Sequence, residues 1–86
     1  MSRLIHIGFG NVVNESKIVA IVHPEAAPIR RLVSHAKDRG LAVDATQGRK
    51  TKAVIVMEGQ QVVLSALLPE TILGRVETQD DGEEQE

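Results

Sequence analysis

Short apolar runs, separated by turn-forming residues, recur along the chain and predict a small β-sheet. The runs are rich in Val, Ile and Leu and span residues 3–8, 17–23, 41–46, 51–57 and 61–67. Runs of about four to eight such residues are typical of β-strands. The segment Gly8-Phe9-Gly10-Asn11, after the first run, has the composition of a turn.

A helix is predicted between the second and third of these strands. Its apolar residues recur at helical spacing and form one stripe: Ile29, Leu32, Val33 and Ala36. Pro28 suits the first helical position, and Gly40 suits the position just beyond the end. A second, short helix opens at residues 69–73, where Pro and Glu favour a helix start.

The predicted order β-β-α-β-β-β-α places the chain in the α+β class. The last three strands are joined by short loops, so we expect an antiparallel meander within a small, mostly antiparallel sheet. The long helix should cover one face of this sheet, but the strands carry apolar residues on both faces. We expect the second face to stay uncovered within the chain, which predicts self-association.

The composition is that of one small domain. The chain has 86 residues, of which 42% are hydrophobic and 26% charged, too apolar a balance for a disordered protein. It has no Cys, which excludes disulfides and thiolate-bound zinc, and no uncharged run long enough for a bilayer. The N-terminus lacks the apolar block of a signal peptide. We therefore expect a cytoplasmic protein without a membrane partner.

The formal net charge of -2 conceals a segregation of charge along the chain. Residues 1–76 hold all ten Lys and Arg against six acids, a formal charge of +4, whereas residues 77–86 hold six acids and no base. We interpret residues 1–76 as the folded domain and residues 77–86 as an acidic, disordered tail. This asymmetry fits a nucleic-acid-binding surface and equally fits an ordinary domain with a solubilising tail.

No set of residues has the spacing of a catalytic or metal site. The three His residues, at positions 6, 23 and 35, show no paired ligand spacing. No Ser lies in a nucleophile-elbow context, and the Gly8–Gly10 turn lacks the third glycine and the helix of a dinucleotide-binding loop. We therefore expect no catalysis, no cofactor and no bound metal.

The densest group of cations lies at the start of the fourth predicted strand. Arg49, Lys50 and Lys52 are close together, and Lys50 and Lys52 share one face of an extended chain. Gly48 is a structural position that lets the backbone approach a ligand, and Thr51 adds a hydroxyl for phosphate. The pattern fits contact with phosphates, but the residues alone slightly favour the alternative, a charged rim that keeps an edge strand from aggregating.

The other candidates for contact with nucleic acid are scattered along the chain. Lys17 and Asn11 are further candidates for phosphate contact, although the sequence alone favours a turn-stabilising role for Asn11. Arg30 and Arg31 fit the solvated face of the helix, and contact with a polyanion is the less favoured alternative for both. Phe9 is the only aromatic residue, which disfavours stacking on single-stranded nucleic acid. Binding of double-stranded DNA by so few cations requires a closed oligomer that repeats the cluster.

Motifs along the chain resemble those of one bacterial family. They are, in order, Ile7-Gly8-Phe9-Gly10-Asn11, residues 22–31, Asp38-Arg39-Gly40, residues 44–54 and Pro69-Glu70-Thr71. Together they cover nearly all of residues 4–76 and are similar to the extracellular-matrix regulatory protein A (RemA-like) family. The acidic tail lies outside this resemblance.

The resemblance implies a transcriptional regulator of biofilm-matrix and osmoprotection genes, acting as a ring-shaped homo-oligomer on promoter DNA. The DNA-binding positions that it implies fall on Arg49, Lys50, Lys52, Lys17 and Asn11, and Pro28 falls on a structural position near the helix start. Lys50 and Lys52 stand where Arg is common, so we expect them to contact phosphates and not base edges. Two other functions fit the residues: a ring-forming adaptor that binds another protein, and a small-ligand sensor that uses the Gly8–Asn11 turn.

Overall fold

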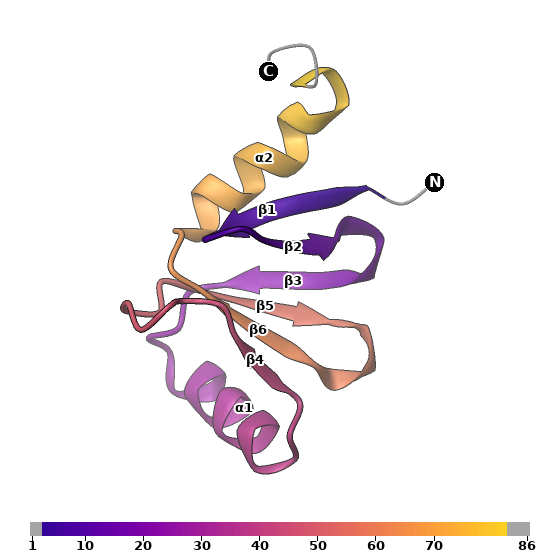
Figure 1. Ribbon diagram of the computed structural model, residues 1–86. Helices are drawn as coiled ribbons and strands as arrows, with labels where there is room; N and C mark the ends of the chain where they lie inside the picture. The colour runs from indigo at the N-terminus through magenta and orange to yellow at the C-terminus, as the bar shows by residue number, and fades with distance from the viewer. Residues whose placement is uncertain (1–2, 83–86) are drawn as a thin grey trace.

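The computed structural model describes the backbone of residues 3–82 and the side chains of residues 3–76 (Figure 1). The elements in chain order are β1 (Leu4–Gly8), β2 (Asn11–Asn14), a 3-10 turn (Glu15–Lys17), β3 (Ile18–Val22), α1 (Ala27–Asp38), β4 (Ala42–Asp44), β5 (Ala53–Met57), a second 3-10 turn (Glu58–Gln60), β6 (Val62–Ser65) and α2 (Pro69–Gly82). This arrangement confirms the α+β class.

The strands form two sheets. β1 and β2 pair antiparallel as a hairpin, and the other four strands form a sheet in the order β3-β5-β6-β4. β5 and β6 are antiparallel neighbours, but β4 lies parallel to β6, with Val43 opposite Val63. The predicted antiparallel meander is therefore wrong for β4. Residues 45–52 connect β4 to β5 across the intervening strand β6. This connection is long enough, because two strand spacings amount to only about 10 Å.

β2 is a strand that the sequence pattern did not predict, so the predicted order lacks one element. It has only two apolar residues, Val12 and Val13, between two Asn residues. Pairing with β1 defines it, since Val13 lies opposite Ile5 and both side chains are buried. A strand this short depends on its partner more than on its own apolar run.

Side chains alternate along β5 and point into two separate cores. Val54 faces α1 and packs in one buried cluster with Ala36 and Val62. Its neighbour Ile55 belongs to a second buried cluster on the other face of the sheet. α1 therefore covers one face, as predicted, and lies below the sheet in Figure 1.

The other face is covered within the chain, which corrects the expectation of an open second face. Ile5 and Ile7 of β1 belong to the same buried cluster as Ile55, and Ile72 of α2 completes it. Figure 1 shows β1 and α2 on the side of the molecule away from α1. The sequence pattern missed this cover because it missed β2 and placed no hairpin over the sheet.

A buried hydroxyl connects the hairpin to the four-stranded sheet. Ser65 is completely buried at the end of β6. Its Oγ donates to the Ile7 carbonyl at 2.8 Å and accepts from the Leu67 amide at 3.0 Å. Because β1 pairs in its sheet with β2 alone, this bond holds β1 against β6 without a strand ladder.

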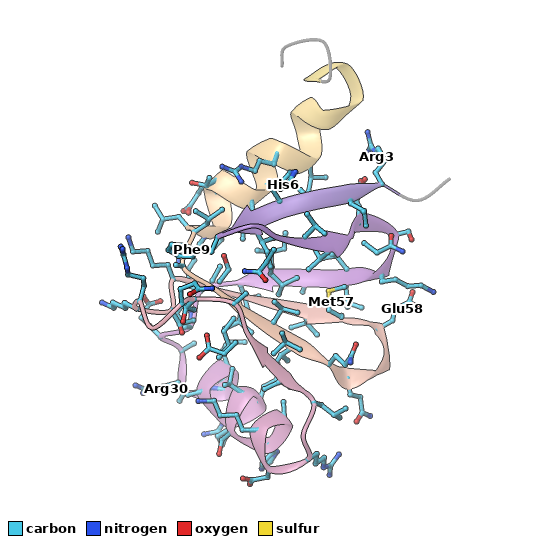
Figure 2. All side chains as sticks on the ribbon, in the orientation of Figure 1. Arg3, His6, Phe9, Arg30, Met57 and Glu58 are labelled. Carbon is cyan, nitrogen blue, oxygen red and sulfur yellow. The ribbon has the colours of Figure 1, made fainter. Side chains whose placement is uncertain are left out.

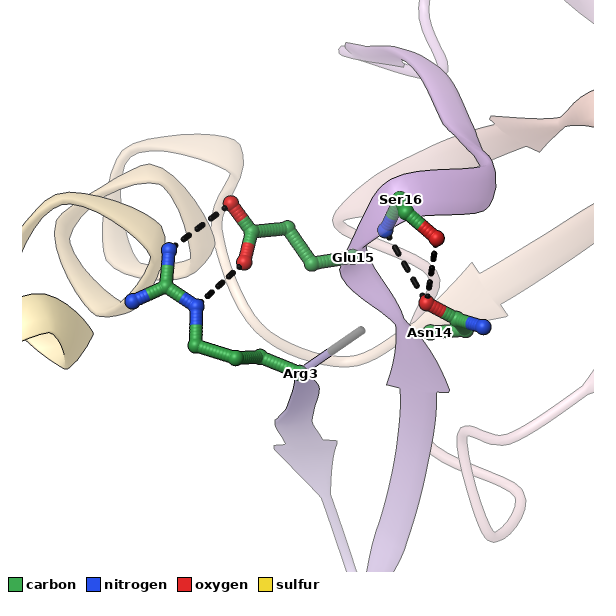
Figure 3. Close-up of polar contacts among 4 residues, drawn as sticks. All are labelled: Arg3, Asn14, Glu15 and Ser16. Carbon is green, nitrogen blue, oxygen red and sulfur yellow. Dashed lines mark hydrogen bonds and ion pairs between the residues drawn. The ribbon is translucent and has the colours of Figure 1, made fainter. Parts of the chain in front are cut away.

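An ion pair holds the chain in place just before the first residue of β1, as Figure 3 shows. The Arg3 guanidinium donates to both carboxylate oxygens of Glu15, at 2.9 and 3.2 Å. Such a two-point contact is more directional than a single bond. Beside it, the Asn14 side-chain oxygen accepts from the Ser16 amide and hydroxyl, at 3.0 and 2.8 Å, and caps the 3-10 turn.

α2 is longer than the sequence predicted. The expected disordered tail begins at residue 77, whereas the backbone is helical as far as Gly82. Residues 77–82 contain no Pro and include Glu and Gln, which favour helix, so nothing ends the helix at residue 77. Residues 83–86 of the expected tail lie outside the described part of the chain. No helix within residues 3–82 has the length and apolar character needed to cross a membrane.

Replacing Ser65 with Ala should lower the free energy of unfolding by about 1–3 kcal/mol, because the Ile7 carbonyl loses its buried donor. Urea unfolding at a fixed protein concentration measures the change. Ser34→Ala is the matched control, since Ser34 is exposed on α1 and such changes cost within about 0.5 kcal/mol. Equal stabilities of the two variants would contradict the structural role of Ser65.

Candidate nucleic-acid interface

The predicted cationic cluster lies on the connection between β4 and β5. A tight turn shapes this connection, because the Arg49 amide donates to the Thr46 carbonyl at 3.0 Å. The two central residues, Gln47 and Gly48, have φ angles of 55° and 77°. Two consecutive positive φ angles are typical of a type I′ turn, and Gly adopts them without strain. A Cβ atom at Gly48 would meet no atom within 4 Å, and the residue is exposed to solvent.

Asp44 and Thr46 anchor the base of this turn. Asp44 Oδ1 accepts from the Thr46 hydroxyl at 2.6 Å and from the Thr46 amide at 2.9 Å. The hydroxyl bond, followed by the amide bond, holds the pKa of Asp44 below its ordinary value of 3.8. Burial opposes this lowering, and the charge of Lys37 adds to it. Thr46 is itself buried, so the turn leaves the sheet from a fixed point.

The turn between β1 and β2 contacts the loop between β4 and β5 through Phe9 and Arg49. The Arg49 guanidinium carbon lies 5.5 Å from the centre of the Phe9 ring, which is a cation–π interaction. Phe9 is 48% exposed, so the pair lies at the surface. Sequence reasoning did not include Phe9 among the candidate site residues. Its only signal was that it is the sole aromatic residue of the chain.

Asn11 belongs to the same surface, but its amide group holds the hairpin turn together. Its Nδ2 donates to the Gly8 carbonyl at 2.9 Å and to the Phe9 carbonyl at 3.4 Å. Phe9 has a φ of 55°, a conformation that such bonds stabilise. This geometry favours the turn-stabilising role of Asn11, and its contact with phosphate stays a prediction.

Lys50 and Lys52 continue the exposed surface beyond Arg49. The Lys52 amide donates to the Ser65 carbonyl at 2.9 Å, which fixes the backbone of this segment against β6. All three cationic side chains are exposed. Among the side chains of residues 3–76, no carboxylate forms an ion pair with any of the three. Their charges are therefore available to an external anion.

Lys17 lies at the other end of the sheet. Its Nζ is 3.6 Å from Oε1 of Glu58, and both side chains are exposed. Figure 2 shows Glu58 at the opposite end of the molecule from Phe9, the residue that Arg49 contacts. Within one subunit, the structure brings Arg49, Phe9 and the Asn11 turn together and leaves Lys17 apart.

Pro28 lies in the first turn of α1, at the helix start where the sequence placed it. His23 lies between two exposed carboxylates, with Nδ1 3.9 Å from Glu25 and Nε2 3.4 Å from Glu70. Nowhere in the described part of the chain do three or more His, Asp or Glu side chains form a group that could hold a metal ion.

Known proteins are similar to this chain over nearly its whole length. The model of the RemA-like family, described as extracellular matrix regulatory protein A-like, matches residues 4–76. A relative from Lachnoclostridium phytofermentans is 60% identical over 100% of this chain and 94% of its own. Relatives from Clostridium acetobutylicum and Brevibacillus brevis are 54% and 53% identical, over 93% and 92% of this chain and 87% and 92% of theirs. All three bear the name "Putative regulatory protein".

Thr46→Val should raise the pKa of Asp44 toward 3.8, because the variant loses the hydroxyl that contributes most to the lowering. A carbon-13 NMR titration of the Asp44 carboxyl measures this. In the wild-type protein, the lowered pKa of Asp44 stabilises the fold at pH values above the pKa that Asp44 has in the unfolded chain. This stabilisation is lost as the pH falls through the pKa of Asp44 in the folded protein. Thr71→Val, at an exposed position, is the control. An unchanged Asp44 pKa in Thr46→Val would exclude the hydroxyl as the main cause.

Proposed function

The chain belongs to the RemA-like family of regulatory proteins, and we propose that it is a transcriptional regulator that binds double-stranded promoter DNA. Its expected targets are genes of the biofilm-matrix and osmoprotection type, and its acting form is a ring-shaped homo-oligomer. One observation carries the proposal: Arg49, Lys50 and Lys52 are exposed together on an anchored loop, with no ion-pair partner among residues 3–76.

The chemistry of these side chains suits phosphate. A guanidinium offers two parallel hydrogen bonds to phosphate oxygens, and each Lys offers a point charge. The contact with Phe9 restricts the Arg49 side chain before DNA binds, which lowers the entropic cost of binding. Because phosphate contacts carry no sequence information of their own, selection of promoters by this surface depends on DNA shape more than on base edges.

One subunit offers only a few phosphate contacts, so the proposal requires repetition. Each neutralised phosphate adds to a salt-dependent affinity. A ring presents the same loop once per subunit, and contacts with one DNA molecule then reinforce each other.

Exposed apolar side chains around β3 support such an assembly. β3 is an edge strand, and Val19 lies at its bulge with 64% of its surface exposed. Val19 and Leu32 of α1 line a groove of about 450 Å³, whereas Val19 and Leu73 of α2 line another of about 430 Å³. An edge strand between two grooves with exposed apolar side chains is a surface that another chain can cover.

A different apolar area lies on the outer face of the hairpin, where Leu4 and Val12 are exposed. Two unlike surfaces on one subunit suit a head-to-tail contact between copies. Such contacts close into a ring when the rotation between neighbours allows it, whereas a two-fold dimer would use the same surface twice. The apolar surfaces thus favour a ring over a simple dimer.

Replacing Arg49 and Lys50 together with Ala should weaken duplex binding and flatten its salt dependence. Each lost phosphate contact removes about 0.9 from the slope of log affinity against log salt. Fluorescence anisotropy of a labelled promoter duplex, between about 50 and 200 mM salt, measures both quantities. Arg31→Ala, which removes an exposed cation of α1, should keep the wild-type slope. A wild-type protein that ignores duplex DNA at low salt would refute DNA binding and favour the adaptor hypothesis.

The wild-type protein should have a mass several times that of its 9.3 kDa subunit when light scattering is recorded after gel filtration. Val19→Asp should reduce this mass, because it places a charge on the proposed contact surface. Val43→Asp is the control, since Val43 is 50% exposed on the other edge strand. A wild-type mass of one subunit would overturn the ring, and an unchanged mass in Val19→Asp would exclude the β3 edge as the contact.

A further inference from the structure

α1 separates two grooves of different character. The groove shared with β3 contains the exposed apolar residues described above, whereas the groove on the other flank of the helix is basic. This second groove has a volume of about 370 Å³. Its lining includes Arg30, Ser34, Lys37, Thr51, Val33 and Val54.

The basic groove is continuous with the loop between β4 and β5, which carries Arg49, Lys50 and Lys52. Thr51, which lines it, lies between Lys50 and Lys52 in the chain. Figure 2 shows Arg30 and Phe9 toward the same end of the molecule, away from Met57 and Glu58. Because Arg49 contacts Phe9, Arg30 lies toward the same side of the molecule as the loop that carries Arg49.

The cations of the groove have little competition from acids. Arg30 and Lys37 are exposed, and neither forms an ion pair with a carboxylate within residues 3–76. Lys37 acts on Asp44 at longer range, but the Asp44 carboxylate already accepts two hydrogen bonds from Thr46. The groove consequently keeps a positive charge that an anion can neutralise.

We propose that this groove binds the sugar–phosphate backbone of the same DNA that the loop contacts, with Arg30 and Lys37 as phosphate-binding residues. The Ser34 and Thr51 hydroxyls can donate to phosphate oxygens, as such side chains do in many protein–DNA interfaces. The apolar part of the lining suits the uncharged sugar between two phosphates. The inference rests on the proposed DNA binding and extends the contact from one loop to a track across the flank of α1.

Arg31 provides a matched comparison for Arg30. Consecutive residues of an α-helix point about 100° apart around its axis. Arg30 lines the groove, whereas Arg31 is exposed and does not line it. The two residues carry the same charge on the same helix turn, so they differ chiefly in their position relative to the groove.

The test measures the salt dependence of duplex binding by Arg30→Gln and Arg31→Gln, with the mass and melting temperature of each variant recorded. We expect Arg30→Gln to bind duplex DNA more weakly than the wild-type protein at low salt. Between about 50 and 200 mM salt, its affinity should also fall less than that of the wild-type protein, by a factor of about three to four for each subunit that contacts the DNA. Adding Lys37→Gln should enlarge the effect, and Arg30→Lys should restore the slope. Arg31→Gln should keep the slope of the wild-type protein.

Equal slopes for Arg30→Gln and Arg31→Gln would overturn the inference. If Arg49→Ala with Lys50→Ala still flattened the slope in that case, the proposed DNA binding would stand without the groove. If the wild-type protein bound no duplex, the proposed function itself would fail. Free phosphate shares the chemistry of the backbone, so a thermal-shift titration with inorganic phosphate accompanies the test. Equal DNA slopes, with phosphate stabilisation that Arg30→Gln abolishes, would overturn the DNA track and assign the groove to a free anion.

Discussion

The β5–β6 pair is apolar on both faces, and the need to bury both of them explains where the two helices and the β1–β2 hairpin lie. Val54 and Ile55 are neighbours in β5 and both are completely buried, although they face opposite sides of the sheet. One side requires α1 as a cover, and the other requires the β1–β2 hairpin together with α2. With one aromatic residue in the chain, the cores consist of aliphatic side chains whose close packing depends on both covers being in place.

The two-sided cover also creates the candidate interface. The hairpin brings its turn to the end of the sheet where the connection between β4 and β5 lies, so that Phe9 meets Arg49. Ser65 serves both segments, because its hydroxyl donates to Ile7 of the hairpin and its carbonyl accepts from the Lys52 amide. Core packing and presentation of the cations are therefore coupled through one buried residue.

Local patterns predicted those parts of the fold that are local in sequence. The apolar stripe from Ile29 to Ala36, with Pro28 before it, predicted α1 within a residue or two of its bounds. The β5–β6 hairpin followed from two apolar runs around Gly59. β2 did not follow, because its two Val residues form too short an apolar run and the strand depends on pairing with β1. The parallel pairing of β4 with β6 did not follow, because it depends on the path of the connection between β4 and β5. α2 ends later in the chain than predicted, because the acidic composition after residue 76 does not by itself stop a helix.

The residues of the chain alone predict the α+β class, the cationic segment at residues 49–52 and the motifs that relate the chain to its family. These features depend only on the composition of the chain and on the spacing of its residues. Folding places Phe9 against Arg49, pairs Lys17 with Glu58 at the far end of the sheet, and covers the second sheet face from within the chain. The physical reason is that these contacts join segments far apart in the chain, and their positions follow from how the covers pack and not from local residue preferences.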